Sequence, residues 1–372
     1  MPGDRDARRS TSRPRALALL AFFLAGALLA FGCGGPNNFP DGVPGKTPGE
    51  ITAASKATAH YQRGIELYDA GRYRKAINAF RASLKYNPDD PRPCLEIGAC
   101  YSRLGQLERE LAAYDKALAI LPDFVPAHNS RGVALLRLDR LDEAVEAFGR
   151  AIKREVDYAP AHINIAIAYS RLGRYELALM SLDNAEQFGG SAFDVASNRG
   201  LILVELGRYG EAADAFERAL HERPGYHPVR FERAMAVAKD GYPGEAIREL
   251  ERLTTIQPEF TQAYLEKARL LAEIGRPQHA LKQYEEYLKR APKDPEAWNE
   301  AGNVHFALGQ YTQAEACFRK AIAYRRGYYN AYLNLAATLE RLGRERDAAR
   351  IRRRAERYQP EPPPEQNQNQ EH

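Results

Sequence analysis

The sequence has few residues that could carry redox or metal chemistry. Its 372 residues include four cysteines, Cys33, Cys94, Cys100 and Cys317, and no two of them form a CxxC pair. Cys94 and Cys100 are six residues apart on one predicted helix, so their side chains point in different directions. The sequence therefore predicts neither a disulfide framework nor a zinc site, and no metal or other cofactor.

Recognisable catalytic patterns are also missing. No Ser/His/Asp arrangement, phosphate-binding loop or carboxylate pair stands out from a helical background rich in Ala, Glu and Arg. His60, His128 and His162 occupy equivalent points of an internal repeat. Such points on neighbouring packed helices are roughly 10 Å apart, whereas zinc needs ligands about 2 Å from one ion. We therefore expect half-buried packing histidines and no enzymatic activity.

A large excess of charge of one sign is missing as well. The formal net charge is +4, and residues 1–32 supply +3 of it through five arginines and two aspartates, which leaves +1 for the rest. Charges of both signs alternate along the predicted helix faces. The sequence thus predicts no nucleic-acid partner, and it shows no pattern for a small-molecule substrate.

What the sequence does contain is one pattern repeated every 34 residues, most clearly in Pro295–Tyr328. Small and apolar residues at helical spacing predict a helix, a glycine turn and a second helix in each copy. A fixed period of this kind is typical of a stacked repeat array. Nine copies follow one another without insertion, starting at Ala57, Pro91, Val125, Ala159, Phe193, His227, Thr261, Pro295 and Tyr329.

Five positions, counted from the start of each copy, define the repeat. Position 8 is always Gly or Ala, and position 20 is Ala except for Glu110 in the second copy, so the two helices can cross closely. Position 24 is large, predicted to fill space toward the next repeat, until Arg352 in the last copy. Position 15 is Gly in eight copies and Asp139 in the third, as expected for a left-handed residue ending a helix. Proline at position 32 closes the second helix in six copies.

This pattern resembles the tetratricopeptide repeat, and the resemblance covers Ala57–Pro362. It implies an all-α fold in which about nine helix-turn-helix repeats stack into a right-handed superhelical solenoid, with the first helix of each repeat lining a concave groove. Two departures concern packing: Glu110 puts the packing of the second repeat in question, and Arg352 lies where a solenoid must end in a polar face. At position 32, proline is replaced by Val156, Gly190 and Arg326.

Positions 2, 5, 9, 12 and 13 share one side of the first helix and are expected to face the groove. Apolar residues in its middle predict either a site for a peptide with apolar anchors or packing against neighbouring repeats. Arg103, Arg137 and Arg171 at position 13 predict either a basic stripe for an acidic segment or a solvated face with salt bridges to nearby glutamates.

Asparagines at position 6, Asn164 and Asn198 among them, could hold a peptide backbone. The arrangement is similar to asparagine ladders in some superhelical tetratricopeptide proteins. The predicted partner-binding residues are Tyr61, Arg103, Asn129, Arg137, Ile163, Asn164, Arg171, Asn198, Phe231, Arg269, Asn299 and Asn303.

The amino terminus has the pattern of a bacterial secretory signal over residues 1–32. Met1–Arg15 is polar and arginine-rich, and Ala16–Phe31 is uninterruptedly apolar. Cys33 directly after Gly32 resembles a lipobox, which implies a lipidated cysteine as the mature first residue, although Phe31 stands where a small residue is usual. An uncleaved membrane anchor and plain secretion are the alternatives.

The remaining segments complete the predicted organisation. Residues 33–56 are Gly- and Pro-rich and predict a tether, residues 57–362 the solenoid, and residues 363–372 a disordered polar tail. No catalytic domain is left to place, which predicts a non-enzymatic scaffold that is lipid-anchored in the bacterial envelope and docks a protein or peptide. It would be similar to tetratricopeptide lipoproteins that assist envelope assembly.

The alternative is an interaction or regulatory subunit of a cell-envelope enzyme complex for peptidoglycan or polysaccharide. Gly34 follows Cys33, where an aspartate would resemble an inner-membrane retention signal. The periplasmic face of the outer membrane is therefore the favoured location.

Overall fold

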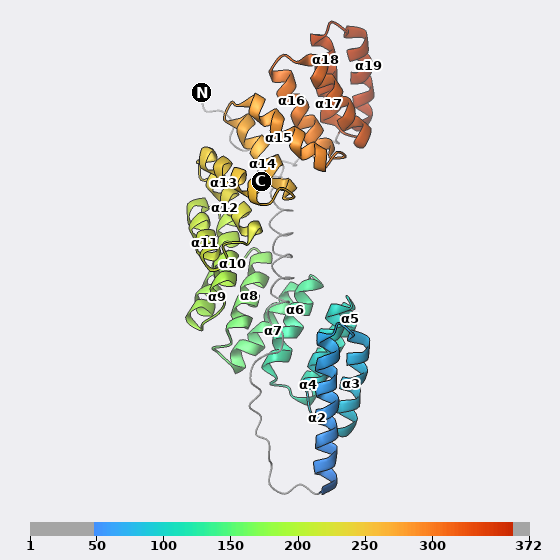
Figure 1. Ribbon diagram of the computed structural model, residues 1–372, viewed down its shortest axis with the longest axis vertical. Coiled ribbons are helices and arrows are strands. Elements are labelled where there is room, and N and C mark those ends of the chain that lie inside the picture. The colour runs from blue at the N-terminus through green and yellow to red at the C-terminus, as the bar shows by residue number, and fades with distance from the viewer. Residues whose placement is uncertain (1–47, 360–372) are drawn as a thin grey trace, which may run out of the picture. The chain divides into compact units, whose positions relative to one another are not determined.

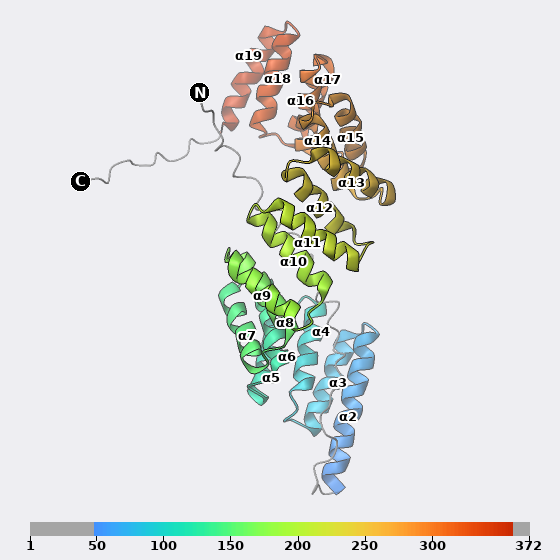
Figure 2. The ribbon, with the colours of Figure 1, turned by 90° about the vertical axis from the view of Figure 1, so that its left-hand side faces the viewer.

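The computed structural model describes residues 48–359, and within them it contains eighteen α-helices, one short 3-10 helix and no strand. The predicted all-α repeat fold is confirmed. The described residues divide after Pro224 into two compact units, which we call unit 1 and unit 2. Figures 1 and 2 show antiparallel helix pairs in both units.

Unit 1 consists of five helix pairs, one for each of the first five repeats. In each unit the first helix of a pair packs most extensively on its second helix, and each second helix packs on the first helix of the next pair. The pairs of unit 1 are α2 (Pro48–Asp69) with α3 (Tyr73–Tyr86), α4 (Arg92–Arg103) with α5 (Leu107–Ile120), α6 (Val125–Arg137) with α7 (Leu141–Arg154), α8 (Ala159–Arg171) with α9 (Tyr175–Gln187), and α10 (Ala192–Glu205) with α11 (Tyr209–Glu222).

Unit 2 consists of four helix pairs, followed by the 3-10 helix η1 (Glu356–Tyr358). Its pairs are α12 (His227–Lys239) with α13 (Pro243–Ile256), α14 (Thr261–Glu273) with α15 (Pro277–Arg290), α16 (Pro295–Ala307) with α17 (Tyr311–Tyr324), and α18 (Tyr329–Arg341) with α19 (Glu345–Ala355). None of the helices α2–α19 combines the length and the apolar character that crossing a membrane requires.

The turn between the two helices of every repeat has the predicted left-handed residue. The glycines at position 15 have φ between 68° at Gly105 and 96° at Gly241, and Asp139 has φ 60°. Asp139 is the only non-glycine residue with positive φ among the described residues. Asparagine and aspartate tolerate this conformation better than other side chains, so a first helix can end here without glycine.

In five repeats, an aromatic ring at position 24 lies directly on a glycine at position 8. A Cβ atom added to Gly132 would lie 2.5 Å from Phe148 Cε1, and one added to Gly98 would lie 2.2 Å from Tyr114 Cε1. Position 24 therefore fills the space within its own repeat, in addition to any contact with the next one. Five repeats combine a glycine at position 8 with an aromatic residue at position 24, namely Gly64/Phe80, Gly98/Tyr114, Gly132/Phe148, Gly200/Phe216 and Gly302/Phe318.

The first helix begins earlier than the sequence analysis placed it. Helix α2 starts at Pro48, so the last nine residues of the predicted tether, 48–56, are helical. Proline is compatible with the first turn of a helix, and the residues from Glu50 to Lys56 include neither glycine nor proline to interrupt it. Predictions on the leader, on Cys33 and on the tail beyond Gln359 concern residues outside the described range.

Where proline is missing at position 32, the chain uses other means to end the second helix. Helix α9 ends at Gln187, and Gly189 follows with φ 72°. The Gly190 N–H then donates to the Ala185 carbonyl at 2.7 Å. A Cβ on Gly190 would lie 2.7 Å from the same oxygen, so a larger residue is excluded. Glycine at this position is thus a second way of closing a repeat.

Candidate partner-binding face of the first helices

The first helices of neighbouring repeats contact one another as well as their own second helices. In unit 1, α4 contacts α6, α6 contacts α8, and α8 contacts α10, and in unit 2 α16 contacts α18. In each unit, we call the surface formed by positions 5, 6, 9, 12 and 13 of its first helices the first-helix face. Most of the predicted partner-binding residues lie on it, so its contacts decide which of them are available.

At three points among the described residues, position 6 of one repeat bonds to position 5 of the preceding repeat. Asn164 Nδ2 donates to Asn129 Oδ1 at 2.9 Å, and Asn334 Nδ2 donates to Asn299 Oδ1 at 3.0 Å. In the first two repeats the direction is reversed, since the Tyr61 hydroxyl donates to Glu96 at 3.3 Å. Of the asparagines at position 6, Asn164 and Asn334 therefore tie successive first helices together.

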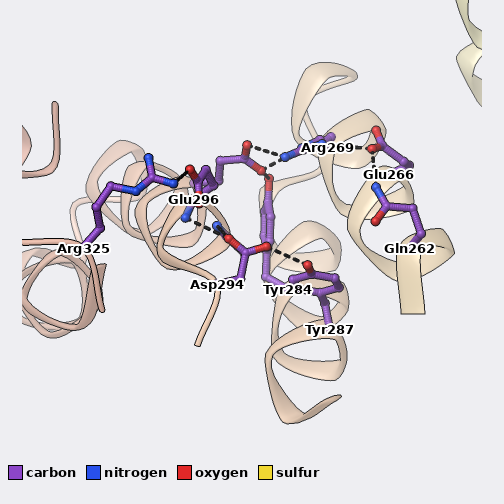
Figure 3. Close-up of polar contacts among 10 residues, drawn as sticks. Gln262, Glu266, Arg269, Tyr284, Tyr287, Asp294, Glu296 and Arg325 are labelled. Carbon is purple, nitrogen blue, oxygen red and sulfur yellow. Dashed lines mark hydrogen bonds and ion pairs between the residues drawn. The ribbon is translucent and has the colours of Figure 1, made fainter. Parts of the chain in front are cut away.

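Repeats 7 and 8 contain an ionic version of the same contact (Figure 3). Arg269 donates through Nε and Nη2 to both oxygens of Glu300, at 2.8 and 2.7 Å. Its Nη1 donates to Glu266 at 2.9 Å, and the Gln262 side-chain amide donates to the same carboxylate. Bidentate pairing of this kind fixes direction as well as distance. Burial acts to lower the pKa of Arg269, but its bonds to Glu300 and the charge of Glu266 raise it overall.

The second helix of repeat 7 supports this network through two tyrosines. The Tyr284 hydroxyl donates to Glu300 at 3.2 Å, and the Tyr287 hydroxyl donates to Asp294 at 2.6 Å. Burial and the Glu300 carboxylate raise the pKa of Tyr284, so its hydroxyl stays protonated as a donor. Asp294 also caps α16 by accepting from the backbone N–H groups of Glu296 and Ala297. The start of α16 is thereby fixed (Figure 3).

Repeats 8 and 9 contain a three-asparagine cluster on the first-helix face. Asn334 Nδ2 donates to Asn303 Oδ1 at 2.9 Å in addition to Asn299. Asn303 is exposed, and Leu333 beside Asn334 in the sequence is 38% exposed. Among the described residues, no side chain or backbone group bonds to Asn303 Nδ2 or to Asn334 Oδ1. These two atoms keep a free donor and a free acceptor.

Each of the three arginines in the predicted basic stripe at position 13 bonds to the preceding repeat, and in each case one acceptor lies 35 residues earlier in the sequence. Arg103 Nε donates to the Tyr68 hydroxyl at 3.1 Å, and Arg171 Nη1 donates to the Leu136 carbonyl at 2.6 Å. Arg171 also pairs with Asp139 at 2.7 Å. The guanidinium groups of the predicted basic stripe thus hold successive repeats together, and within residues 48–359 only Arg137 of the three pairs with a glutamate.

Arg137 explains the unusual Glu110 at position 20. The Glu110 side chain is only 1% exposed, and its carboxylate accepts a hydrogen bond from Arg137 Nη1 at 2.8 Å. Arg137 Nη1 also donates to Ser102 Oγ at 2.6 Å. Burial raises the pKa of Glu110, while the charge of Arg137 acts to lower it. The acid that replaces alanine in repeat 2 is therefore compensated by an arginine from repeat 3.

The other predicted residues have separate environments. Ile163 is buried at 4% exposure, and Phe231 lies against Phe260 with ring centroids 5.4 Å apart. Asn198 donates to the Asp194 carbonyl of its own helix at 2.8 Å. The structure therefore brings together Asn129 with Asn164, and Asn299 with Asn303, and it does not assemble the twelve residues into one cluster.

Position 4 shows how the histidines are used. His128 Nε2 lies 2.7 Å from the Pro122 carbonyl, and His162 Nε2 lies 2.8 Å from the Val156 carbonyl. Trp298 Nε1 makes the same contact with Pro292 at 2.8 Å. Each of these rings therefore holds the loop that precedes its helix. Within residues 48–359, no group of three His, Cys, Asp or Glu side chains is arranged to hold a metal.

The three described cysteines are free and buried. Burial raises the pKa of Cys100 to about 12 and that of Cys317 to about 11, and it also raises the pKa of Cys94. Protonated thiols are poor nucleophiles and poor metal ligands. Cys94, Cys100 and Cys317 consequently act as small packing residues.

Some functional residues were missed by the sequence analysis. Glu96, Glu266 and Glu300 all occupy position 6 and all bond to a neighbouring first helix or to their own. Their common position is visible in the sequence, whereas the hydrogen bonds that each carboxylate makes are not. The sequence predicts Tyr284 as a packing ring, and no sequence pattern predicts the hydrogen bond from its hydroxyl to Glu300.

The architecture is that of an all-α solenoid of paired helices, a class that serves as a scaffold for protein interactions. Comparison with known families agrees with it. The tetratricopeptide repeat profile matches residues 61–123, 129–194, 163–227, 197–260, 231–295 and 265–322, and a second TPR repeat profile matches residues 302–343. The chain belongs to the tetratricopeptide repeat family, whose domains bind protein or peptide partners and are generally non-catalytic.

Individual relatives are distant. Hsp70-Hsp90 organizing protein 2 of Arabidopsis thaliana is 27% identical over 71 residues, which are 19% of this chain and 12% of that protein. The match thus spans a small part of that relative's length.

Among solved structures, a tetratricopeptide repeat protein from Parabacteroides merdae is similar with a TM-score of 0.51 and 15% identity, covering 63% of this chain and 93% of that one. PilW, a type IV pilus biogenesis factor, is similar with a TM-score of 0.52 and 20% identity, covering 55% and 94%. At these identities the similarity concerns the fold.

Proposed function

We propose that the chain is a non-enzymatic scaffold, held at a bacterial envelope membrane by a lipidated Cys33, that docks an extended segment of a protein partner. The observation that supports docking most directly is the unused amide capacity of repeats 8 and 9. Asn303 Nδ2 and Asn334 Oδ1 keep a free donor and a free acceptor on the first-helix face, while Asn334 Nδ2 already holds Asn299 and Asn303 in place.

An extended peptide needs such groups because its main chain offers N–H and C=O in alternation. Asparagines that are already fixed by one hydrogen bond lose less conformational freedom when they bind. Leu333 is 38% exposed next to Asn334 and would supply an apolar contact for one side chain of the peptide. The cluster would therefore combine sequence-independent backbone contacts with one apolar anchor.

The envelope location rests on the amino-terminal pattern of Ala16–Phe31 followed by Gly32 and Cys33. We favour the periplasmic face of the outer membrane. PilW, which has a similar fold, is a type IV pilus biogenesis factor, and we propose a comparable role in assembling an envelope complex.

The docking site is tested by site-specific photocrosslinking in envelope membranes. A benzophenone residue replaces Leu333 on the first-helix face, and the matched control replaces Leu177, which is 43% exposed on the second helix α9. We expect a discrete crosslinked protein from position 333 that is lost with Asn303→Ala, and none from position 177. Equal crosslinking at both positions would contradict docking on this face.

The anchor is tested separately with Cys33→Ser. We expect the intact protein to float with membrane vesicles and Cys33→Ser to remain soluble after a high-salt wash, while both give the same crosslink at position 333. If Cys33→Ser still floats, residues 16–31 are an uncleaved anchor and the lipoprotein proposal is wrong. If the crosslinked protein is an envelope enzyme whose activity falls without this chain, the regulatory-subunit alternative is favoured instead.

A further inference from the structure

Among the described residues, the last α-helix and the short 3-10 helix after it carry a row of exposed arginines. Helix α19 (Figure 1) buries Ala348, Ile351 and Ala355. The first three members of the row follow the spacing i, i+4 and i+7, which places them on one side of α19, opposite that buried side. The fourth, Arg357, lies in the 3-10 helix η1 that follows α19. The row, which we call the terminal basic face, consists of Arg346, Arg350, Arg353 and Arg357, all exposed.

The other repeats show that this row is not a general property of second helices. Its members occupy positions 18, 22, 25 and 29 of repeat 9, and all four positions are basic in that repeat alone. Repeat 1 has three basic residues there, and each of repeats 2–7 has at least one acid, such as Glu108, Asp183 or Glu251. A polar end to the solenoid would be satisfied by charges of either sign, so the single sign needs a further explanation.

The terminal basic face has few counter-ions of its own. Arg350 donates to Asp347 at 3.1 Å, but Asp347 also accepts from Arg344 at 2.8 Å. Arg346, Arg353 and Arg357 have no carboxylate partner among the described residues. Helix α19 carries five arginines against two acids, a net charge of +3 over eleven residues, compared with +4 for the whole chain.

The chemistry of this face selects among anionic partners. All its charged groups are guanidinium groups, which bind phosphate oxygens in a bidentate manner. The exposed residues of α19 include no apolar side chain larger than Ala349. A protein interface normally has an apolar core inside its polar rim, whereas a layer of lipid headgroups is held by charge alone. The face therefore fits a phosphate layer better than an acidic protein.

We infer that the terminal basic face binds the headgroups of anionic phospholipids, so that unit 2 is drawn to the membrane surface by charge. This inference rests on the proposed function, which places the chain at a membrane. Each arginine near an anionic surface contributes about fivefold to the partition constant. Removing three of them should weaken binding about a hundredfold, and screening by salt should have a similar effect.

The test uses the full chain, reconstituted with vesicles of neutral phosphatidylcholine or with vesicles that also contain phosphatidylglycerol. A fluorescent non-natural residue at Ala349 reports energy transfer to acceptor dyes on the lipid headgroups. A second reporter at Ala112, the equivalent of position 350 in repeat 2, is the control. We expect the transfer at position 349 to rise with phosphatidylglycerol and to fall again with R346A/R353A/R357A, while position 112 stays unchanged.

A charge-matched variant, R150A/R218A/R248A, removes three exposed arginines from three different second helices and should leave the signal at position 349 intact. Equal transfer from neutral and anionic vesicles would overturn the inference, as would an equal loss in the two triple variants. A signal abolished by duplex DNA at equal phosphate concentration would mean a nucleic-acid site instead, which also overturns it. Failure of the chain to float with neutral vesicles concerns the anchor only, because the response to phosphatidylglycerol is measured independently.

Discussion

Both units contain a guanidinium–carboxylate contact between repeats, but the two contacts arise from different parts of the repeat. In unit 1, Glu110 replaces the alanine that eight other copies have at position 20, and Arg137 of the next repeat pairs with it. In unit 2, Arg269 and Glu300 lie at positions 9 and 6, where polar contacts recur along the first helices. The first is a local exception that one partner compensates, whereas the second recurs at the next junction, where Asn303 and Asn334 occupy the same two positions.

This difference predicts that the contact in unit 1 can be removed without loss if both partners are changed together. A buried acid without a counter-ion is costly, whereas alanine at position 20 is the ordinary residue of this chain. In unit 2, by contrast, Arg269 serves two carboxylates, so no single second substitution restores the balance.

The largest effect is expected from Arg137→Ala, which leaves Glu110 buried and unpaired. It should lower the free energy of unfolding by about 3–5 kcal/mol, measured by urea unfolding followed through helicity. Glu110→Ala/Arg137→Ala should recover most of this loss, because alanine fits position 20. A double variant as unstable as Arg137→Ala would mean that Arg137 stabilises the chain mainly through Ser102.

Arg269→Ala should cost somewhat less, about 2–3 kcal/mol. Its partner Glu300 is 30% exposed and can regain water, whereas Glu266 is 5% exposed and cannot. Adding Glu300→Gln should therefore restore little, in contrast to the pair in unit 1. Full recovery in this double variant would show that the two contacts are equivalent after all.

A third substitution tests the packing that both units share. Gly132→Ala places a Cβ 2.5 Å from Phe148 Cε1 and should cost about 1–3 kcal/mol. Phe148→Leu added to it should recover part of the stability, because repeats 4 and 6 have this alanine–leucine combination in Ala166/Leu182 and Ala234/Leu250. Thermal melting of the natural chain and of the two variants checks the order, and a double variant less stable than Gly132→Ala would contradict it.

The smallest effect is a pH dependence at Glu110. Because burial raises its pKa above the ordinary 4.5, the folded chain holds this proton more tightly than the unfolded chain does. Its contribution to stability is then present below that value and is lost as the pH rises through the folded pKa. Glu110→Gln does not titrate, so its advantage over the natural chain should grow between about pH 4 and about pH 7. An advantage that shrinks over this range would show that the charge of Arg137 outweighs burial.

Much of the fold was predictable because the same pattern of helix and turn residues occurs nine times. Glycine or Asp139 at position 15 predicted the left-handed turns, and all nine have positive φ. The pairing of glycine at position 8 with a ring at position 24 was also present in the sequence. Every repeat with glycine at position 8 has an aromatic residue at position 24, as in Gly132 and Phe148. Neither position predicts this contact when it is taken alone. The start of α2 at Pro48 was missed because no apolar period marks those residues.

The candidate site was less predictable for a physical reason. Helical spacing places a residue on a face, but it does not say whether a long side chain bonds inside the chain or remains free. Arg103, Arg137 and Arg171 share a position and could serve a partner, yet each finds an acceptor in the preceding repeat. Asn303 and Asn129 are both asparagines of a first helix, but they lie at positions 9 and 5 of their repeats, and Asn303 is the more exposed of the two. Such choices depend on the neighbouring repeat.

The left-handed turns also offer a regular series of attachment points. A Cβ added at Gly71, Gly173 or Gly309 would meet no atom within 4 Å, and only the backbone conformation opposes an ordinary side chain there. A D-alanine has the opposite backbone preference, so at these glycines it should adopt the positive φ without strain and stabilise the chain by about 0.4–1 kcal/mol. Labelled D-residues at these glycines would report on one repeat each. Unfolding followed at each label would then show whether the repeats of a unit unfold one by one or together.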